Sequence, residues 1–374
     1  MMNSTFNLHQ TNPLRVLLVT ARYFPYMGGI ETHVYEVARR LAKFNVDTTV
    51  LTTDPKGHAP SFENADGVKI RRVPALPRDR DYYLAPDIYR VVREGNWDVV
   101  HCQGVHTFVP PLTMLACRRA NIPYVVTFHT GGHSSRLRNA FRSVQWTVLR
   151  PLLARARRFI AVSKFEQTFF SEWLQLPPES FDFIPNGSDL PRIEKPIPNT
   201  DEPLIISIGR LERFKGHHRV IAALPFVLEQ SPRARLMILG SGPYERELRH
   251  LARQVNVAER VEFKMIPVGE RARMAETLAG ASLVTLLSDA ESNPVAIMEA
   301  LALGRPALVA NTSGLRELAA QGLARAISPE SPPDQVARAI LEQLKHPLLP
   351  GQVELPTWHD CTRRLLAIYQ AVAN

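Results

Sequence analysis

The sequence predicts an α/β fold of two domains, each built on a parallel β-sheet. Short apolar runs, typical of buried parallel strands, alternate with longer amphipathic segments, typical of helices. The alternation occurs in two blocks, separated by a proline-rich stretch, residues 188–203, that we interpret as a linker. With 374 residues, 45% of them apolar, the chain is long enough for two cores of ordinary size.

The first block, residues 1–187, opens with the apolar strand Arg15–Val19, and a helix is expected from about Ile30 to Lys43. Helical patterns fill most of the gaps between the later strands, and such strand–helix–strand repeats favour a parallel sheet. The later strands of this block are expected at Thr48–Thr52, Asp98–Cys102, Tyr124–Phe128, Phe159–Val162 and Phe181–Ile184.

The second block, residues 204–356, repeats the alternation. An amphipathic helix from about Asp360 to Val372 follows it, after the proline-containing segment Pro347–Pro356. The two blocks together therefore look like two Rossmann-like domains in tandem. Strands of the second block are expected at Leu204–Ile208, Ala234–Leu239, Val261–Met265, Ala281–Leu287 and Ala307–Val309.

The composition narrows the class of protein. A net charge of +9 indicates an anionic partner, such as phosphate, a membrane surface or nucleic acid. The three cysteines, Cys102, Cys117 and Cys361, show neither metal-ligand spacing nor the density of a disulfide framework, which suits a reducing cytosol. Residues 1–13 lack an apolar signal core, and no run approaches the roughly 20 apolar residues of a membrane span. We therefore expect a cytoplasmic protein.

Two glutamates stand at a strand-to-helix junction of the second block. The strand pattern ends near Ser288, and Pro294 fits the first turn of the helix that follows. Glu291 would therefore lie in the loop and Glu299 in the helix, at the sheet edge where open α/β folds bind ligands. Two acids there could hold a polyhydroxyl ligand, on either side of a helix N-terminus that favours phosphate.

Two other strand-to-helix loops carry residues suited to ligand binding. Gly28 and Gly29 follow the first strand, where paired glycines expose backbone N–H groups; a structural turn explains them equally well. The segment lacks the G-x-G-x-x-G spacing of nicotinamide and flavin sites. In the second block, Arg210 and Lys215 occupy the corresponding loop, where a guanidinium fork and an ammonium group can grip a phosphate. The segment is not a Walker loop.

Histidine and aspartate residues raise the question of a catalytic base or a metal. His129 ends a strand beside glycines, where a cleft would form, whereas His101 and His106 show no metal-ligand spacing. The Asp79–Asp81 segment contains two acids that could hold a divalent ion, but a solvated loop is the better explanation because no strand adjoins it. No metal site is expected.

The segment from residue 133 to 158 is strongly basic and contains no acid. Apolar residues recur in it at helical spacing. A basic amphipathic helix could lie on an anionic membrane, or it could pack between elements with a solvated basic face; the sequence leaves both open. The arginines of this segment are Arg136, Arg138, Arg142, Arg150, Arg155, Arg157 and Arg158.

In their order and spacing, these segments resemble the family-4 retaining glycosyltransferases (glycosyl transferases group 1), whose GT-B architecture places two Rossmann-like domains with parallel sheets across a cleft. The resemblance covers nearly the whole chain. The matching segments are Gly28–Thr32, Phe128–His129, Ala161–Lys164, Ile184–Gly187, Gly209–Gly216, Leu239–Pro243, the pair Glu291 and Glu299, and Thr357–Asp360.

The resemblance implies a division of labour between the domains. Residues 1–187 would bind the acceptor, residues 188–203 would form the linker, and residues 204–356 would bind the nucleotide sugar. The final helix, residues 357–374, would pack back onto the first domain, as it does in this family.

The resemblance also implies roles for single residues. Arg210 and Lys215 would bind the donor diphosphate and stabilise it as it leaves, in place of a metal. Glu291 would hold sugar hydroxyls, Glu299 would accept hydrogen bonds from the ribose, and His129 would contact the donor sugar or the reacting acceptor.

The backbone near these residues would take part as well. Gly28 and Gly29 would allow close approach to the diphosphate. Amides of Asn293 to Val295 would lie near the sugar, although Ser292, Asn293 and Pro294 stand where members often carry an aromatic residue and glycine. Pro294 has no N–H to donate.

We therefore predict a retaining transferase, independent of metals and cofactors, that moves a hexosyl or related group from a nucleotide-diphosphate donor to a glycan or lipid-linked acceptor in envelope glycolipid or polysaccharide synthesis. The basic segment Arg136–Arg158 could hold it on the inner face of the cytoplasmic membrane. A GT-B-fold nucleotide-sugar epimerase and a non-catalytic sugar-nucleotide-binding subunit are the alternatives. A nucleic-acid partner is not expected, because the basic segment lacks a set of stacking aromatics.

Overall fold

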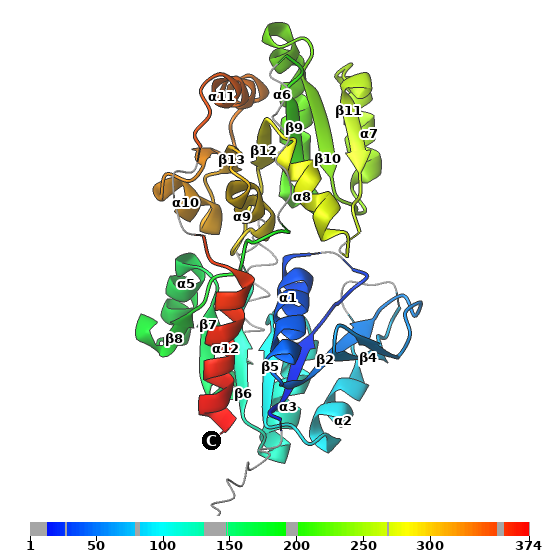
Figure 1. Ribbon diagram of the computed structural model, residues 1–374, viewed down its shortest axis with the longest axis vertical. Helices are drawn as coiled ribbons and strands as arrows, with labels where there is room; N and C mark the ends of the chain where they lie inside the picture. Colours follow the sequence, from blue (N-terminus) through cyan, green and yellow to red (C-terminus); the bar gives the residue numbers. More distant parts are fainter. Residues whose placement is uncertain are drawn as a thin grey trace, which may run out of the picture.

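The computed structural model describes residues 13–26, 28–78, 83–130, 147, 149–191, 201–267, 269–349 and 355–373. Within these ranges the strands form two sheets, one of eight strands and one of six. In Figure 1 the two sheets lie at opposite ends of the molecule, each covered by helices. The predicted α/β class with two parallel sheets is confirmed.

The eight-stranded sheet has the order β3-β4-β2-β1-β5-β6-β7-β8, and all neighbours are parallel except β3 and β4. Neither β3 nor β4 was predicted from the sequence. Strand β3 is a short edge strand whose side chains are mostly exposed, and β4 carries three basic residues among its buried apolar ones. The strands are β1 Arg15–Thr20, β2 Asp47–Asp54, β3 Phe62–Ala65, β4 Val68–Pro74, β5 Val99–Gln103, β6 Tyr124–Thr127, β7 Arg158–Ala161 and β8 Phe181–Phe183.

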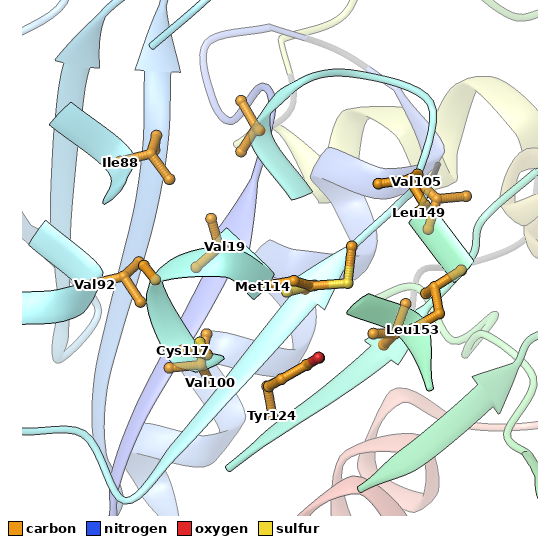
Figure 2. Packing of buried hydrophobic residues seen from close by; sticks show 14 of the residues in the cluster. Val19, Ile88, Val92, Val100, Val105, Met114, Cys117, Tyr124, Leu149 and Leu153 are labelled. Carbon is orange, nitrogen blue, oxygen red and sulfur yellow. The ribbon is translucent and has the colours of Figure 1, made fainter. Parts of the chain in front are cut away.

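Helices cover both faces of this sheet. On one face, α2 and α3 pack on apolar side chains of β1, β5 and β6; Figure 2 shows Val19 and Val100 of the strands close to Met114 and Cys117 of α3. On the other face lie α1 and α12. The helices around this sheet are α1 Gly29–Lys43, α2 Pro86–Glu94, α3 Val109–Ala120, α5 Lys164–Leu174 and α12 Trp358–Ala373, with a 3-10 turn at Pro178–Ser180.

The six-stranded sheet has the order β11-β10-β9-β12-β13-β14, and every neighbouring pair is parallel. Its strands are β9 Leu204–Ile208, β10 Arg235–Leu239, β11 Val261–Lys264, β12 Leu283–Leu286, β13 Ala307–Ala310 and β14 Arg325–Ile327. Its helices are α6 His217–Gln230, α7 Glu245–Gln254, α8 Arg271–Ala279, α9 Val295–Ala302, α10 Ser313–Ala320 and α11 Pro333–Lys345, with 3-10 turns at Arg213–Lys215 and Ala258–Arg260.

The last helix, α12, returns to the first sheet and lies beside α1 (Figure 1). Trp358 and Tyr369 are fully buried there. Gly187 makes this packing possible, because a Cβ atom at that position would lie 2.2 Å from the backbone nitrogen of Trp358. Ser188 donates its backbone N–H to the carbonyl of Pro356 at 2.9 Å, so the two stretches that run between the domains are hydrogen-bonded to each other.

In the described part of the basic segment the helix ends at Leu153, before the last three arginines. Residues 149–153 are helical, Arg155 lies in a turn, and Arg158 opens strand β7. Arg136, Arg138, Arg142 and the Asp79–Asp81 segment lie outside the described residues. Within the described ranges, no helix has the length and apolarity needed to cross a membrane.

Candidate functional site

A cavity of about 460 Å³ lies between the two sheets, and residues of both domains line it. Its position follows from the strand orders. In the first sheet β1 lies between β2 and β5, and in the second β9 lies between β10 and β12. Each sheet thus has its topological switch point at the carboxyl end of its first strand, where open α/β sheets bind ligands. The cavity contains the ends of both strands, at Thr20 and Ile208.

The loop after β9 brings two cations to the cavity. Lys215 Nζ lies 2.5 Å from Glu291 Oε1, and the two side chains are only 16% and 13% exposed. Arg210 is more open and pairs with Glu212 at 2.9 Å. Gly216 has a φ of 79°, and a Cβ atom there would lie 1.9 Å from the carbonyl oxygen of Leu287. Only glycine therefore lets this loop turn closely enough to bring Lys215 to Glu291.

The loop between β12 and α9 carries Glu291 and is hydrogen-bonded to Ser313, the first residue of α10. Ser313 Oγ donates to the carbonyl of Glu291 at 2.7 Å and accepts the backbone N–H of Glu291 at 2.8 Å. The sequence indicated that Pro294 would lie in the first turn of a helix. Helix α9 instead begins at Val295, and Pro294 is the residue before it. Asn293, Pro294 and Val295 all line the cavity.

Glu299 lies on α9 at the edge of the cavity and is 3% exposed. Its carboxylate is paired with Arg271 of α8. The same guanidinium lies 3.4 Å from Glu36 of α1, in the first domain. Burial raises the pKa of Glu299, although Arg271 favours its ionised form. The structure thus links Glu299 to the first domain through Arg271, a residue that the sequence had not singled out.

On the first domain, Gly28 and Gly29 line the cavity at the start of α1. Gly28 has an extended backbone, with a φ of 175°, so it is not required for an unusual turn. Glu31 follows them into the cavity. Burial raises the pKa of Glu31, and the positive charges of Arg210 and Lys215 across the cleft oppose this.

His129 lies at the end of β6 with a φ of 51°, a left-handed conformation that strains a non-glycine backbone. Its Nε2 lies 2.6 Å from Gln103 Oε1, and burial lowers the pKa of its imidazole well below the usual value. Since Gln103 Oε1 accepts, Nε2 carries the proton and Nδ1 is left with a lone pair. His101 is fully buried and bonds to Tyr369 and Thr127, which marks it as a structural residue.

The structure brings every residue of the predicted site to one cavity: His129, Arg210, Lys215, Glu291, Glu299, Gly28, Gly29, Asn293, Pro294 and Val295. Behind the residues that line the cavity, Glu166 of α5 is buried and accepts a hydrogen bond from Ser292 at 3.0 Å. Ser163 and Glu166 form the S-x-x-E pattern of a helix cap, which was the available sequence signal. Across the described ranges, no group of three His, Cys, Asp or Glu residues is placed to hold a metal ion.

Comparison with known families assigns both halves of the chain. Residues 27–192 match the family model described as Glycosyltransferase Family 4. Residues 191–354 match the one described as Glycosyl transferases group 1.

Relatives align over most of their length. D-inositol 3-phosphate glycosyltransferase of Nocardiopsis dassonvillei is 27% identical, over 92% of this chain and 90% of its own. GDP-mannose:cellobiosyl-diphosphopolyprenol alpha-mannosyltransferase of Xanthomonas oryzae is 27% identical over 78% and 77%. Phosphatidyl-myo-inositol mannosyltransferase of Mycolicibacterium smegmatis is 26% identical over 96% and 95%.

Solved structures share the fold. Sucrose-phosphate synthase from Thermosynechococcus elongatus superposes with a TM-score of 0.73 at 18% identity, covering 96% of this chain and 95% of its own. Anabaena HepE in complex with UDP and glucose gives a TM-score of 0.70 at 20% identity, with the same coverage. These likenesses extend over both sheets.

Proposed function

The chain belongs to the family-4 glycosyltransferases of the GT-B fold, and we propose that it transfers a sugar from a nucleotide-diphosphate donor with retention of anomeric configuration and without a metal. The observation that carries the proposal is a pair of cations, Arg210 and Lys215, at the carboxyl edge of the second sheet, with His129 lining the same cavity from the first.

Arg210 and Lys215 would hold the donor diphosphate. An ammonium group has more than one N–H to donate, so Lys215 can keep its bond to Glu291 and still donate to a phosphate oxygen. The side chain of Arg210 is 38% exposed, so its guanidinium can turn from Glu212 toward the ligand. Both cations would stabilise the charge that develops on the leaving diphosphate, which is the part a metal plays in other transferases.

The two glutamates would hold the two ends of the donor. Glu291 lies beside Lys215 and would accept hydrogen bonds from sugar hydroxyls. Arg271 bonds to Glu299 Oε1, which leaves Oε2 to accept from the ribose. Arg271 would thus orient the carboxylate for the nucleotide and keep it ionised.

Retention would follow from attack of the acceptor hydroxyl on the face that the diphosphate leaves. The bond from the anomeric carbon to the phosphate oxygen breaks, the bond to the acceptor oxygen forms, and the departing phosphate takes the acceptor proton. His129 stays neutral because burial lowers its pKa, so it would serve as a hydrogen-bond acceptor for a hydroxyl through Nδ1. Closure of the cleft would exclude water and limit hydrolysis of the donor.

For the acceptor, we propose a glycan or a lipid-linked molecule. Relatives named above act on a diphosphopolyprenol and on phosphatidyl-myo-inositol. The net charge of +9 suits such anionic acceptors and the surface that carries them. Binding of anionic but not neutral vesicles, weakened by salt, would support peripheral attachment; equal binding to both would contradict it.

The decisive experiment is a donor screen. A panel of UDP-, GDP- and ADP-sugars is tested for thermal stabilisation of the protein, because a ligand of the folded state raises its stability according to affinity. The stabilising donor is then incubated with candidate acceptors, with and without EDTA, and the anomeric configuration of the product is read by NMR. Transfer with inversion, or transfer lost in EDTA, would contradict the proposal, and isomerisation of the donor alone would identify an epimerase.

A further inference from the structure

The loop that carries Glu291 is held by the first domain as well as by its own. Three contacts join residues 292, 293 and 295 of this loop to the first domain. Ser292 Oγ donates to Glu166 Oε1 at 3.0 Å, and Asn186 Nδ2 donates to the carbonyl of Asn293 at 3.4 Å. Val295 is buried in the same apolar cluster as the core residues of α1 and α12. We call residues 291–295 the donor loop.

Glu166 stands where these contacts meet the cleft. It is fully buried near the start of α5, and its backbone N–H donates to Ser163 Oγ at 3.1 Å. Its carboxylate accepts the backbone N–H of Thr130 at 2.7 Å and that of Val162 at 2.9 Å. One carboxylate therefore ties the ends of β6 and β7 to the donor loop. Thr130 directly follows His129, so the tie reaches the histidine through a single peptide.

The second domain also fixes the helix on which Glu166 stands. Glu317 of α10 accepts the backbone N–H groups of Lys164 and Phe165, the former at 3.2 Å. Amides at a helix N-terminus have no partner within the helix and attract a negative group. Here that group comes from the opposite domain. The start of α5 is thus a contact surface between the domains, and Glu166 lies directly behind it.

We propose that Glu166 is a positioning residue for sugar transfer, which sets the donor loop in register with His129 through the hydroxyl of Ser292. The inference rests on the proposed function. When the domains are in contact, the Glu166 carboxylate accepts hydrogen bonds from Thr130 and from Ser292. His129, which precedes Thr130, and the donor loop are therefore positioned by the same carboxylate. When the domains separate, Ser292 leaves, and the donor loop loses its alignment with His129.

The contact pattern separates this role from a merely structural one. Ser163 and the amides of Thr130 and Val162 belong to the first domain, and they hold Glu166 in place without Ser292. The bond to Ser292 adds nothing within either domain. Loss of this hydrogen bond should therefore leave the fold intact and lower the rate of sugar transfer.

The test compares Ser292→Ala with Ser292→Thr, which keeps a hydroxyl. Glu172→Gln, an exposed glutamate on the same helix, and Ser328→Ala, an exposed serine of the second domain, serve as matched controls. Steady-state rates are measured with the donor and acceptor found by the screen. The affinities for UDP and GDP alone are measured by calorimetry. Hydrogen exchange of amides 162–166 gives a readout that needs no turnover.

In Ser292→Ala we expect kcat to fall about tenfold, which corresponds to about 1.4 kcal/mol in the barrier. Nucleotide affinity should stay within about twofold, since UDP and GDP lack the sugar that the donor loop holds. The threonine variant should restore kcat, and both controls should match the wild type. Amides of Lys164 and Phe165 should exchange faster in Ser292→Ala, because the domains separate more often.

A double-mutant cycle completes the test. If Glu166 and Ser292 act as one unit, Ser292→Ala should cause no further loss in a Glu166→Ala background, which has no acceptor for the Ser292 hydroxyl. Unchanged kcat in Ser292→Ala, additive losses, or no rescue by threonine would each overturn the inference while leaving the transferase assignment intact. A wild type that turns over no donor would refute the proposed function and the positioning role with it, and the exchange comparison would still show whether the link between domains exists.

Discussion

Replacing Lys215 with alanine tests the part of the site on which the proposal depends most. In the wild type the ammonium group lies 2.5 Å from Glu291, and both side chains are largely shielded from water. At an effective dielectric constant of about 20, that separation corresponds to about 7 kcal/mol of attraction before the cost of desolvation. Removing one partner of a buried pair leaves an unpaired charge and costs about 3–5 kcal/mol. Since this pair is partly exposed, we expect Lys215→Ala to lower the free energy of unfolding by about 2 kcal/mol.

The effect on catalysis should be larger and of a different origin. Loss of one group that stabilises developing negative charge costs about 100- to 1,000-fold in kcat. The double variant Lys215→Ala with Glu291→Gln separates the two effects. Its stability should recover, because no unpaired carboxylate remains, while its activity should stay low. Lys345→Ala, an exposed lysine at the end of α11, controls for the loss of one positive charge.

The assay follows release of nucleotide diphosphate with the donor identified by the screen, beside urea unfolding of each variant. Turnover by Lys215→Ala within about threefold of the wild type would refute the catalytic role, because the charge effect predicts a loss of at least about 100-fold. Loss of activity that is restored in the double variant would show that Lys215 serves only to neutralise Glu291.

The other predictions concern contacts within and between the domains. Arg271→Ala should lower the free energy of unfolding by about 3 kcal/mol or more, because it leaves the buried carboxylate of Glu299 unpaired. The double variant Arg271→Ala with Glu299→Gln should regain part of this lost stability, as measured by urea unfolding. Gly187→Ala should displace α12, since its methyl group would meet the backbone of Trp358, and tryptophan fluorescence should shift to the red; an unchanged spectrum and melting temperature would contradict this packing. Burial raises the pKa of Glu166 from 4.5 to about 7, with Glu317 adding to the shift, so the folded state binds more protons between these values. The stability that the protonated carboxyl contributes should be complete below about pH 4.5 and should be lost as the pH rises to about 7, by about 3 kcal/mol in all. In Glu166→Gln the free energy of unfolding should depend less on pH over this range. Parallel pH profiles of stability for the two proteins would show that the pKa shift is absent.

Much of the fold was accessible from the sequence, because buried parallel strands and amphipathic helices leave strong local patterns. The misses have local causes too. Strand β3 is exposed at a sheet edge, and β14 is short and half-exposed. Where burial does not impose a pattern, periodicity cannot identify a strand.

The site was predictable in part for a similar reason. Arg210, Lys215 and Glu291 stand in loops at strand ends, and parallel sheets gather such loops at one edge. The bond between Glu166 and Ser292 joins residues 126 positions apart on different domains. Such a contact depends on how two separately folded units meet, which no local pattern records.

The chain passes between the domains twice, and Ser188 is bonded to Pro356 where the two passages run together. Asp189 also accepts the backbone N–H of Trp358 there. A single passage would let one domain swivel freely about the other. Two connecting segments that are hydrogen-bonded side by side favour one motion, a rotation of the domains about the line that joins the segments. They oppose twisting and sliding of one domain against the other. Each opening should therefore return the domains along the same path, so that the donor loop meets the first domain at the same place in every cycle.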